Sequence, residues 1–167
     1  MLIIVDAQNC DLHPEGSSYM ETDPAFIFRI VEKVQQALAQ DQTIIFTRDI
    51  PIEHKELDER KWDLQIIDDL KELLDEAIEV EKHYYGIPPG KMVTLAKELS
   101  AVDFTKEKIE IIGIETEICV LANLMIFLST FPEAEFVVSK SMVASKNTQG
   151  EEYALELFKH WGVTVLE

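Results

Sequence analysis

The feature that most constrains the fold is a regular alternation of short apolar runs with amphipathic stretches along the whole chain. Most of these runs are apolar at nearly every position, which is typical of strands covered on both faces. We therefore expect an α/β protein, a three-layer α/β/α fold with a six-stranded, mostly parallel sheet. The strands are expected at Leu2–Asp6, Thr43–Thr47, Ala77–Glu81, Lys108–Gly113, Glu135–Ser139 and Val163–Leu166.

The clearest helical pattern follows Asp23 and Pro24, an aspartate suited to a helix cap and a proline suited to the first turn. Apolar residues then recur at helical spacing, at Phe26, Ile30, Val31, Val34 and Leu38. Further helices are expected at about Leu64–Leu74, after Pro89-Gly90, after Thr116, and at about Gln149–Trp161 before Gly162.

Length and composition indicate one domain spanning residues 1–167. The chain has 167 residues, 47% of them hydrophobic, and shows no internal repeat or linker. The formal net charge of −17 argues against nucleic-acid binding, because such a surface repels phosphate.

The expected cellular compartment of the protein rests on signals that the sequence does not contain. No apolar run is long enough to cross a membrane, and no basic leader precedes the first strand. Cys10 and Cys119 form no disulfide or metal-binding pattern, and Cys10 suits a plain loop or packing role. We expect a cytoplasmic protein with no membrane partner.

Three reactive side chains follow expected strands, where parallel sheets bind their ligands. Asp6 ends the first strand, Lys82 follows the third, and Cys119 lies past Gly113 in a helix that Thr116 is expected to cap. Each alone has an ordinary explanation: a turn aspartate, a solvated lysine, a packed cysteine. Together they supply a thiol, a base and a cation. The helix dipole is expected to lower the pKa of Cys119.

The segment Gly113-x-x-Thr116-x-x-Cys119-Val120 resembles the signature of the isochorismatase-like cysteine hydrolases, the superfamily that includes nicotinamidases. Other parts of the chain match the family in type and order. These are Asp6 with Gln8-Asn9, the middle lysine Lys82, and Val143-Ala144-Ser145.

The resemblance implies a Rossmann-like sheet, a homodimer or larger homo-oligomer, and a mechanism. Asp6 would take the proton of Cys119, and Lys82 would stabilise the thiolate. The thiolate would attack a small linear or cyclic amide and form a thioester, which water then hydrolyses. The family also implies a cis peptide at Ile114-Glu115 and an oxyanion hole made by the backbone N–H groups of Glu115 and Cys119.

The segment after the second strand departs from the family pattern. Nicotinamidases bind a divalent metal there, and Asp49 matches its aspartate, but Pro51 replaces the first histidine. Asp49 and His54 are the remaining metal candidates, a thin ligand set, so we expect no cofactor. The residues expected to line the pocket are Gln8, Leu12, Asp49 and Tyr85.

Three functions stay open at this point. The leading hypothesis is an amidase-type hydrolase acting on carbon–nitrogen bonds other than peptide bonds. The second is a vinyl-ether hydrolase of the isochorismatase type, against which Cys119 argues because those enzymes lack a cysteine there. The third is a catalytically silent member with a binding or regulatory role.

Overall fold

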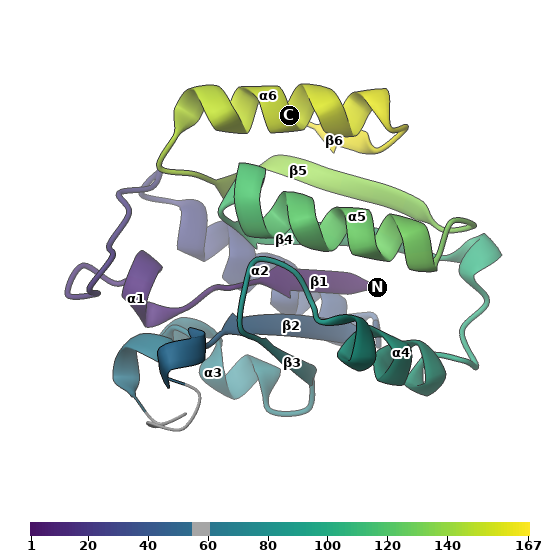
Figure 1. Ribbon diagram of the computed structural model, residues 1–167, viewed down its shortest axis with the longest axis horizontal. Coiled ribbons are helices and arrows are strands. Elements are labelled where there is room, and N and C mark those ends of the chain that lie inside the picture. The colour runs from purple at the N-terminus through teal and green to yellow at the C-terminus, as the bar shows by residue number, and fades with distance from the viewer. Residues whose placement is uncertain (55–60) are drawn as a thin grey trace.

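The sheet has six strands in the order β3-β2-β1-β4-β5-β6, and every neighbouring pair is parallel (Figure 1). The computed structural model describes residues 1–54 and 61–167. The strands are β1 (Leu2–Val5), β2 (Ile44–Asp49), β3 (Ile78–Lys82), β4 (Lys108–Ile114), β5 (Glu135–Ala144) and β6 (Thr164–Leu166). This arrangement confirms the expected parallel α/β fold. The strand order reverses between β1 and β4, so a ligand site is expected at their carboxyl ends.

Helices connect the strands and cover both faces of the sheet. They are α1 (Asn9–Leu12), α2 (Phe26–Ala39), α3 (Asp68–Lys71), α4 (Pro89–Glu98), α5 (Leu121–Thr130) and α6 (Thr148–His160). Short turns add η1 (Ile52–His54), η2 (Trp62–Leu64), η3 (Glu72–Leu74), η4 (Phe104–Lys106) and η5 (Thr116–Val120). Within the ranges that the structure describes, every helix is too short or too polar to span a bilayer.

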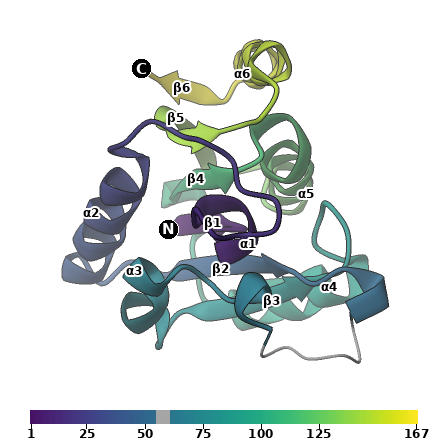
Figure 2. The same ribbon diagram turned by 90° about the vertical axis from the view of Figure 1, so that its left-hand side faces the viewer.

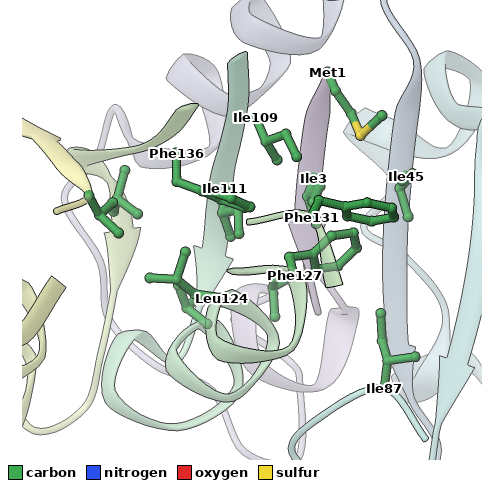
Figure 3. Packing of buried hydrophobic residues seen from close by; sticks show 14 of the residues in the cluster. Met1, Ile3, Ile45, Ile87, Ile109, Ile111, Leu124, Phe127, Phe131 and Phe136 are labelled. Atoms are coloured by element: carbon green, nitrogen blue, oxygen red, sulfur yellow. The ribbon is translucent and has the colours of Figure 1, made fainter. Parts of the chain in front are cut away.

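Two apolar cores lie on opposite faces of the sheet, and successive side chains of β1 belong alternately to one core and the other. Ile3 and Val5 face α4, α5 and α6, whereas Leu2 and Ile4 face α2 and α3 (Figure 2). Figure 3 shows the first core, where Phe127 of α5 packs close to β1. Burial on both faces explains why the strand runs are apolar at nearly every position.

The helix expected over Leu64–Leu74 is confirmed only from Asp68 onward, and its first part is wrong. The segment instead consists of η2, an extended stretch, α3 and η3. In the extended stretch Ile67 N–H donates to Ala7 O at 3.0 Å, and Gln65 O accepts from Asn9 N–H at 2.9 Å. These bonds to the loop after β1 replace the bonds that a helix would make within itself.

Helix α2 begins two residues later than the Asp23-Pro24 pattern indicates. Asp23 Oδ1 accepts from the N–H of Ala25 at 2.9 Å, so it closes the preceding turn rather than capping the helix. Leu38 is exposed, and its neighbour Ala37 takes the buried position.

Strands β2 and β5 run further than expected. Arg48 and Asp49 extend β2 because they pair in register with Glu81 and Lys82 of β3. Strand β5 continues to Ala144 beyond an irregularity opposite β4. The longer β2 brings Asp49 to the same edge of the sheet as Lys82.

We predict that Phe127→Ala lowers the free energy of unfolding by about 3–5 kcal/mol, because it leaves a cavity where a fully buried ring packs. Phe28→Ala is the matched control, since Phe28 is 60% exposed and should change stability by less than about 0.5 kcal/mol. Urea unfolding followed by circular dichroism measures both. Equal losses in the two variants would contradict this account of the core.

Candidate active site

Lys82 is the centre of the site. It ends β3, its side chain is 0% exposed, and a buried ammonium is costly unless other groups solvate it. Its Nζ lies 2.7 Å from Asp6 Oδ2 and 2.9 Å from Asp49 Oδ2, and it donates to Tyr84 O at 3.0 Å. The ends of β1, β2 and β3 therefore meet at one ammonium group.

Asp6 follows β1 with a φ of 49°, in the left-handed region that aspartate tolerates better than most residues. Thr47 of β2 fixes it, because the Thr47 hydroxyl donates to Asp6 Oδ1 at 2.7 Å and accepts from Asp6 N–H at 3.2 Å. Burial raises the pKa of Asp6, and the Lys82 ammonium and Thr47 oppose that shift. A carboxylate with a raised pKa is a stronger base than an exposed one.

Gly113 brings β4 close to β1 beside this site. Its φ is +118°, and a Cβ there would lie 2.1 Å from the carbonyl oxygen of Val5. Only glycine permits that approach. The next peptide bond, Ile114–Glu115, is cis.

Cys119 lies in η5, a π-helical turn between β4 and α5. The Glu115 carbonyl accepts from the N–H groups of both Ile118 and Val120, at 3.1 Å each. The bond from Val120 spans five residues and widens the turn. Neither bond uses the N–H of Cys119.

The prediction that Thr116 caps this helix is wrong. Its hydroxyl donates instead to Glu151 Oε2 of α6 at 3.2 Å, and the helix start has no side-chain cap. Thr116 is fully buried against α6, so its hydroxyl satisfies a tertiary partner rather than the local backbone.

The thiol of Cys119 is half-buried, and its Sγ lies 3.6 Å from Lys82 Nζ. Burial raises the pKa of Cys119 and the negative charge of Asp6 raises it further, whereas Lys82 acts in the opposite direction. The expected lowering by the helix dipole is therefore wrong, because desolvation and Asp6 outweigh the cationic contributions.

Gln8 holds Asp49 in place. Its Nε2 donates to the carbonyls of Asp49 and Leu64, at 3.0 and 2.9 Å, and its Oε1 accepts from Asp49 N–H at 2.7 Å. Gln8 is 1% exposed, so these bonds satisfy an otherwise costly buried amide.

Asn123, which the sequence analysis did not single out, ties Cys119 to the loop after β3. Its Nδ2 donates to the carbonyls of Cys119 and Tyr85 at 2.8 and 3.1 Å, and its Oδ1 accepts from Ile87 N–H at 3.0 Å. The available signal was an amide four residues after Cys119 in an otherwise apolar helical segment.

A cavity of about 340 Å³ opens over these side chains, a volume that suits a small ligand. Asp6 and Cys119 line it, and so does Glu115. Of the residues expected to line the pocket, Gln8, Asp49 and Tyr85 do so. Leu12 does not line the cavity. Its apolar side chain is 3% exposed and packs in the same core as residues of α2.

Cys10 also lies on the cavity wall, where its thiol donates to Asp11 Oδ2 at 2.9 Å. Burial and the neighbouring aspartates raise the pKa of Cys10. The carboxylate beside it disfavours a thiolate, which makes it a poor second nucleophile.

The described residues do not fit a metal ion. Asp6, Asp49 and Cys119 offer ligand atoms within 4.8 Å of one another, but the Lys82 ammonium already lies among them. A divalent ion there would meet a buried positive charge.

The second metal candidate is the pair of Asp49 and His54. His54 lines the cavity, and its Nδ1 is buried with no partner among the described residues. Pro51 lies on the same wall without a ligand atom. Within the described ranges this pair supplies two protein ligands, fewer than the three that catalytic zinc sites use, so no step of the chemistry below passes through a metal.

Comparisons with known proteins agree on the fold. The nicotinamidase of Bacillus subtilis is similar over 99% of this chain and 98% of its own, with 22% identity and a TM-score of 0.81. A pyrazinamidase of Pyrococcus horikoshii, crystallised in complex with zinc, has 22% identity and a TM-score of 0.80 over 99% and 97% of the chains. The yeast nicotinamidase bound to the inhibitor nicotinaldehyde has 17% identity and a TM-score of 0.76 over 99% and 98%.

No curated protein sequence matches the chain. The family model of the isochorismatase domain, however, matches residues 1–167. This match confirms the family that the segment around Cys119 resembles: the chain belongs to the isochorismatase family.

Proposed function

We propose that this hydrolase of the isochorismatase family cleaves the carbon–nitrogen bond of a small linear or cyclic amide through a thioester on Cys119. The observation that carries the proposal is the buried ammonium of Lys82, which contacts both Asp6 and Cys119 on the wall of one cavity. The fold shared with nicotinamidases and a pyrazinamidase supports an amide as the substrate.

In the first step Asp6 accepts the proton of Cys119 as the sulfur attacks the amide carbon. The raised pKa of Asp6 suits a base that must take a proton near neutral pH. Lys82 lies 3.6 Å from the sulfur and stabilises the thiolate as it forms. A thiol that ionises only with substrate present is protected from side reactions.

The attack places negative charge on the former carbonyl oxygen. The backbone N–H groups of Glu115 and Cys119 are the proposed donors to that oxygen, and each such donor is typically worth about 3 kcal/mol. The bonds from Ile118 and Val120 to the Glu115 carbonyl hold this backbone in place without using Cys119 N–H.

The tetrahedral intermediate then collapses, the carbon–nitrogen bond breaks, and Asp6 returns its proton to the leaving amine or ammonia. Asp6, again a carboxylate, activates a water molecule that attacks the thioester carbon. The carboxylic acid leaves, and the proton taken from water returns to Cys119. This cycle requires a cysteine nucleophile, which a vinyl-ether hydrolase of the isochorismatase type lacks.

We also propose that the protein acts in the cytoplasm as a homodimer or larger homo-oligomer. Both cysteines are free, and the catalytic thiol requires reducing conditions. Tyr84, Val93 and Met125 are exposed along an apolar groove of about 750 Å³ between α4 and α5, where a second copy would bury them.

We predict that Cys119→Ala abolishes ammonia release from small amides, with a loss of at least about 1,000-fold in kcat, because no other group forms the thioester. Mass spectrometry of acid-quenched reactions should show an acyl adduct on Cys119 in the wild type. In the matched variant Cys10→Ala, the adduct should stay on Cys119. An adduct on Cys10, or equal turnover by Cys119→Ala, would refute the mechanism.

We predict that Asp6→Asn lowers the pKa of Cys119 and that Lys82→Met raises it. Asp6 opposes the thiolate and Lys82 favours it, so removing each charge shifts the titration in opposite directions. The measurement is thiolate absorbance near 240 nm against pH, with the spectrum of the same variant carrying Cys119→Ala subtracted to remove Cys10. Shifts of the same sign in both variants would contradict the proposed charge arrangement.

We predict that the protein sediments at micromolar concentration as a species of at least twice the 19.1 kDa chain mass. Met125→Glu should weaken that assembly, because it places a charge on the apolar groove. A wild-type chain that sediments as a monomer at these concentrations would overturn the proposed assembly.

A further inference from the structure

We propose that the amide substrate carries a positive charge, with Asp49 and Asp63 as its counter-charges in the pocket. This inference deepens the proposed function, on which it rests, by naming the charge class of the substrate.

The catalytic centre has an excess of negative charge. Lys82 is fully buried, and its single positive charge is shared between the carboxylates of Asp6 and Asp49 at 2.7 and 2.9 Å. Among the described residues of the centre, Lys82 is the one cation beside these two carboxylates, so it balances only one of their charges. Formation of the oxyanion adds a further negative charge, so a cation on the substrate would stabilise that step.

The part of the cavity wall that the structure describes has an excess of negative charge as well. Among the described residues that line it, carboxylates outnumber exposed ammonium groups, and Lys61 supplies the ammonium. The carboxylates belong to Asp6, Asp11, Asp49, Asp63 and Glu115.

Two of these carboxylates already have partners in the loop before α6. Lys146 Nζ lies 3.2 Å from Asp11 Oδ1, and the backbone N–H of Lys146 donates to Glu115 Oε2 at 3.1 Å. Neither Asp11 nor Glu115 therefore needs the substrate as a partner.

Asp49 and Asp63 are the carboxylates with unused acceptor capacity. The side chain of Asp49 is 30% exposed, and only its Oδ2 receives a donor from the part of the chain that the structure describes. Asp63 is half-buried, and from the described residues its side chain accepts one long bond, from Ser17 N–H at 3.4 Å. In a partly enclosed cavity, these charges act on a ligand more strongly than they would in open water.

One aromatic side chain lies on the same wall and adds to a site for a cationic ring. Tyr85 lines the cavity, and its ring lies 4.1 Å from that of Tyr84, centroid to centroid. Aromatic faces attract cations, whereas an anion would meet both ring faces and carboxylates unfavourably. The net charge of −17 attracts cations over longer distances in the same sense.

The test compares three pyridine-3-carboxamides of similar shape: neutral nicotinamide, the permanent cation 1-methylnicotinamide, and a ring-carboxylated nicotinamide as the anion. Calorimetry measures their binding to Cys119→Ala, and ammonia release by the wild type gives kcat/KM. We expect the cation to bind at least about tenfold more tightly than nicotinamide at about 20 mM salt, with the ratio shrinking as salt screens the charges. The anion should bind most weakly.

Asp63→Asn should reduce the ratio of cation to neutral affinity by about threefold or more. Glu133→Gln is the matched control. Glu133 is exposed and lies just before β5, at the amino end of that strand, so its replacement should leave the ratio unchanged. Nicotinamide binding as tightly as the cation, or equal ratios in the two variants, would overturn the inference. Failure of the wild type to hydrolyse any amide would refute the proposed function instead, and the binding ratio would still decide the charge class.

Discussion

The buried ammonium of Lys82 is the interaction on which the rest of the site depends. A charge with no exposure needs counter-charges, and the parallel sheet supplies them from the ends of two neighbouring strands, as Asp6 and Asp49. The register of β2 against β3 places Asp49 beside Lys82, and Gln8 fixes its backbone. The same ammonium also contacts Cys119, so one buried charge both holds the strand ends together and takes part in the proposed chemistry.

The location of that charge also underlies the kind of catalysis that we propose for the site. The position that a metal ion would take among Asp6, Asp49 and Cys119 belongs to Lys82. A lysine holds its carboxylates without becoming a Lewis acid, so the mechanism that we propose assigns activation of the thiol to Asp6. The upward shift in the pKa of both Asp6 and Cys119 suits proton transfer within the substrate complex rather than a standing thiolate.

The sequence predicted the parallel sheet and its approximate strands because burial on both faces leaves a continuous apolar run, a purely local signal. Features set by distant partners were not predictable in this way. The first part of the helix expected at Leu64–Leu74 is replaced by backbone bonds to the loop after β1, and Thr116 bonds to Glu151 of α6. Asn123 acts through bonds to Cys119 and to the loop after β3, and the sign of the Cys119 pKa shift depends on burial.

The most direct test of the central claim is a crystal structure of the protein treated with nicotinaldehyde, an aldehyde that a catalytic thiol would trap as a thiohemiacetal. We expect a covalent bond from Cys119 Sγ to the aldehyde carbon, with the new oxygen facing the backbone N–H of Cys119. We also expect that Lys82 Nζ still bridges Asp6 and Asp49. An unmodified Cys119 with the aldehyde bound elsewhere, or a metal ion in place of the Lys82 ammonium, would contradict the central claim.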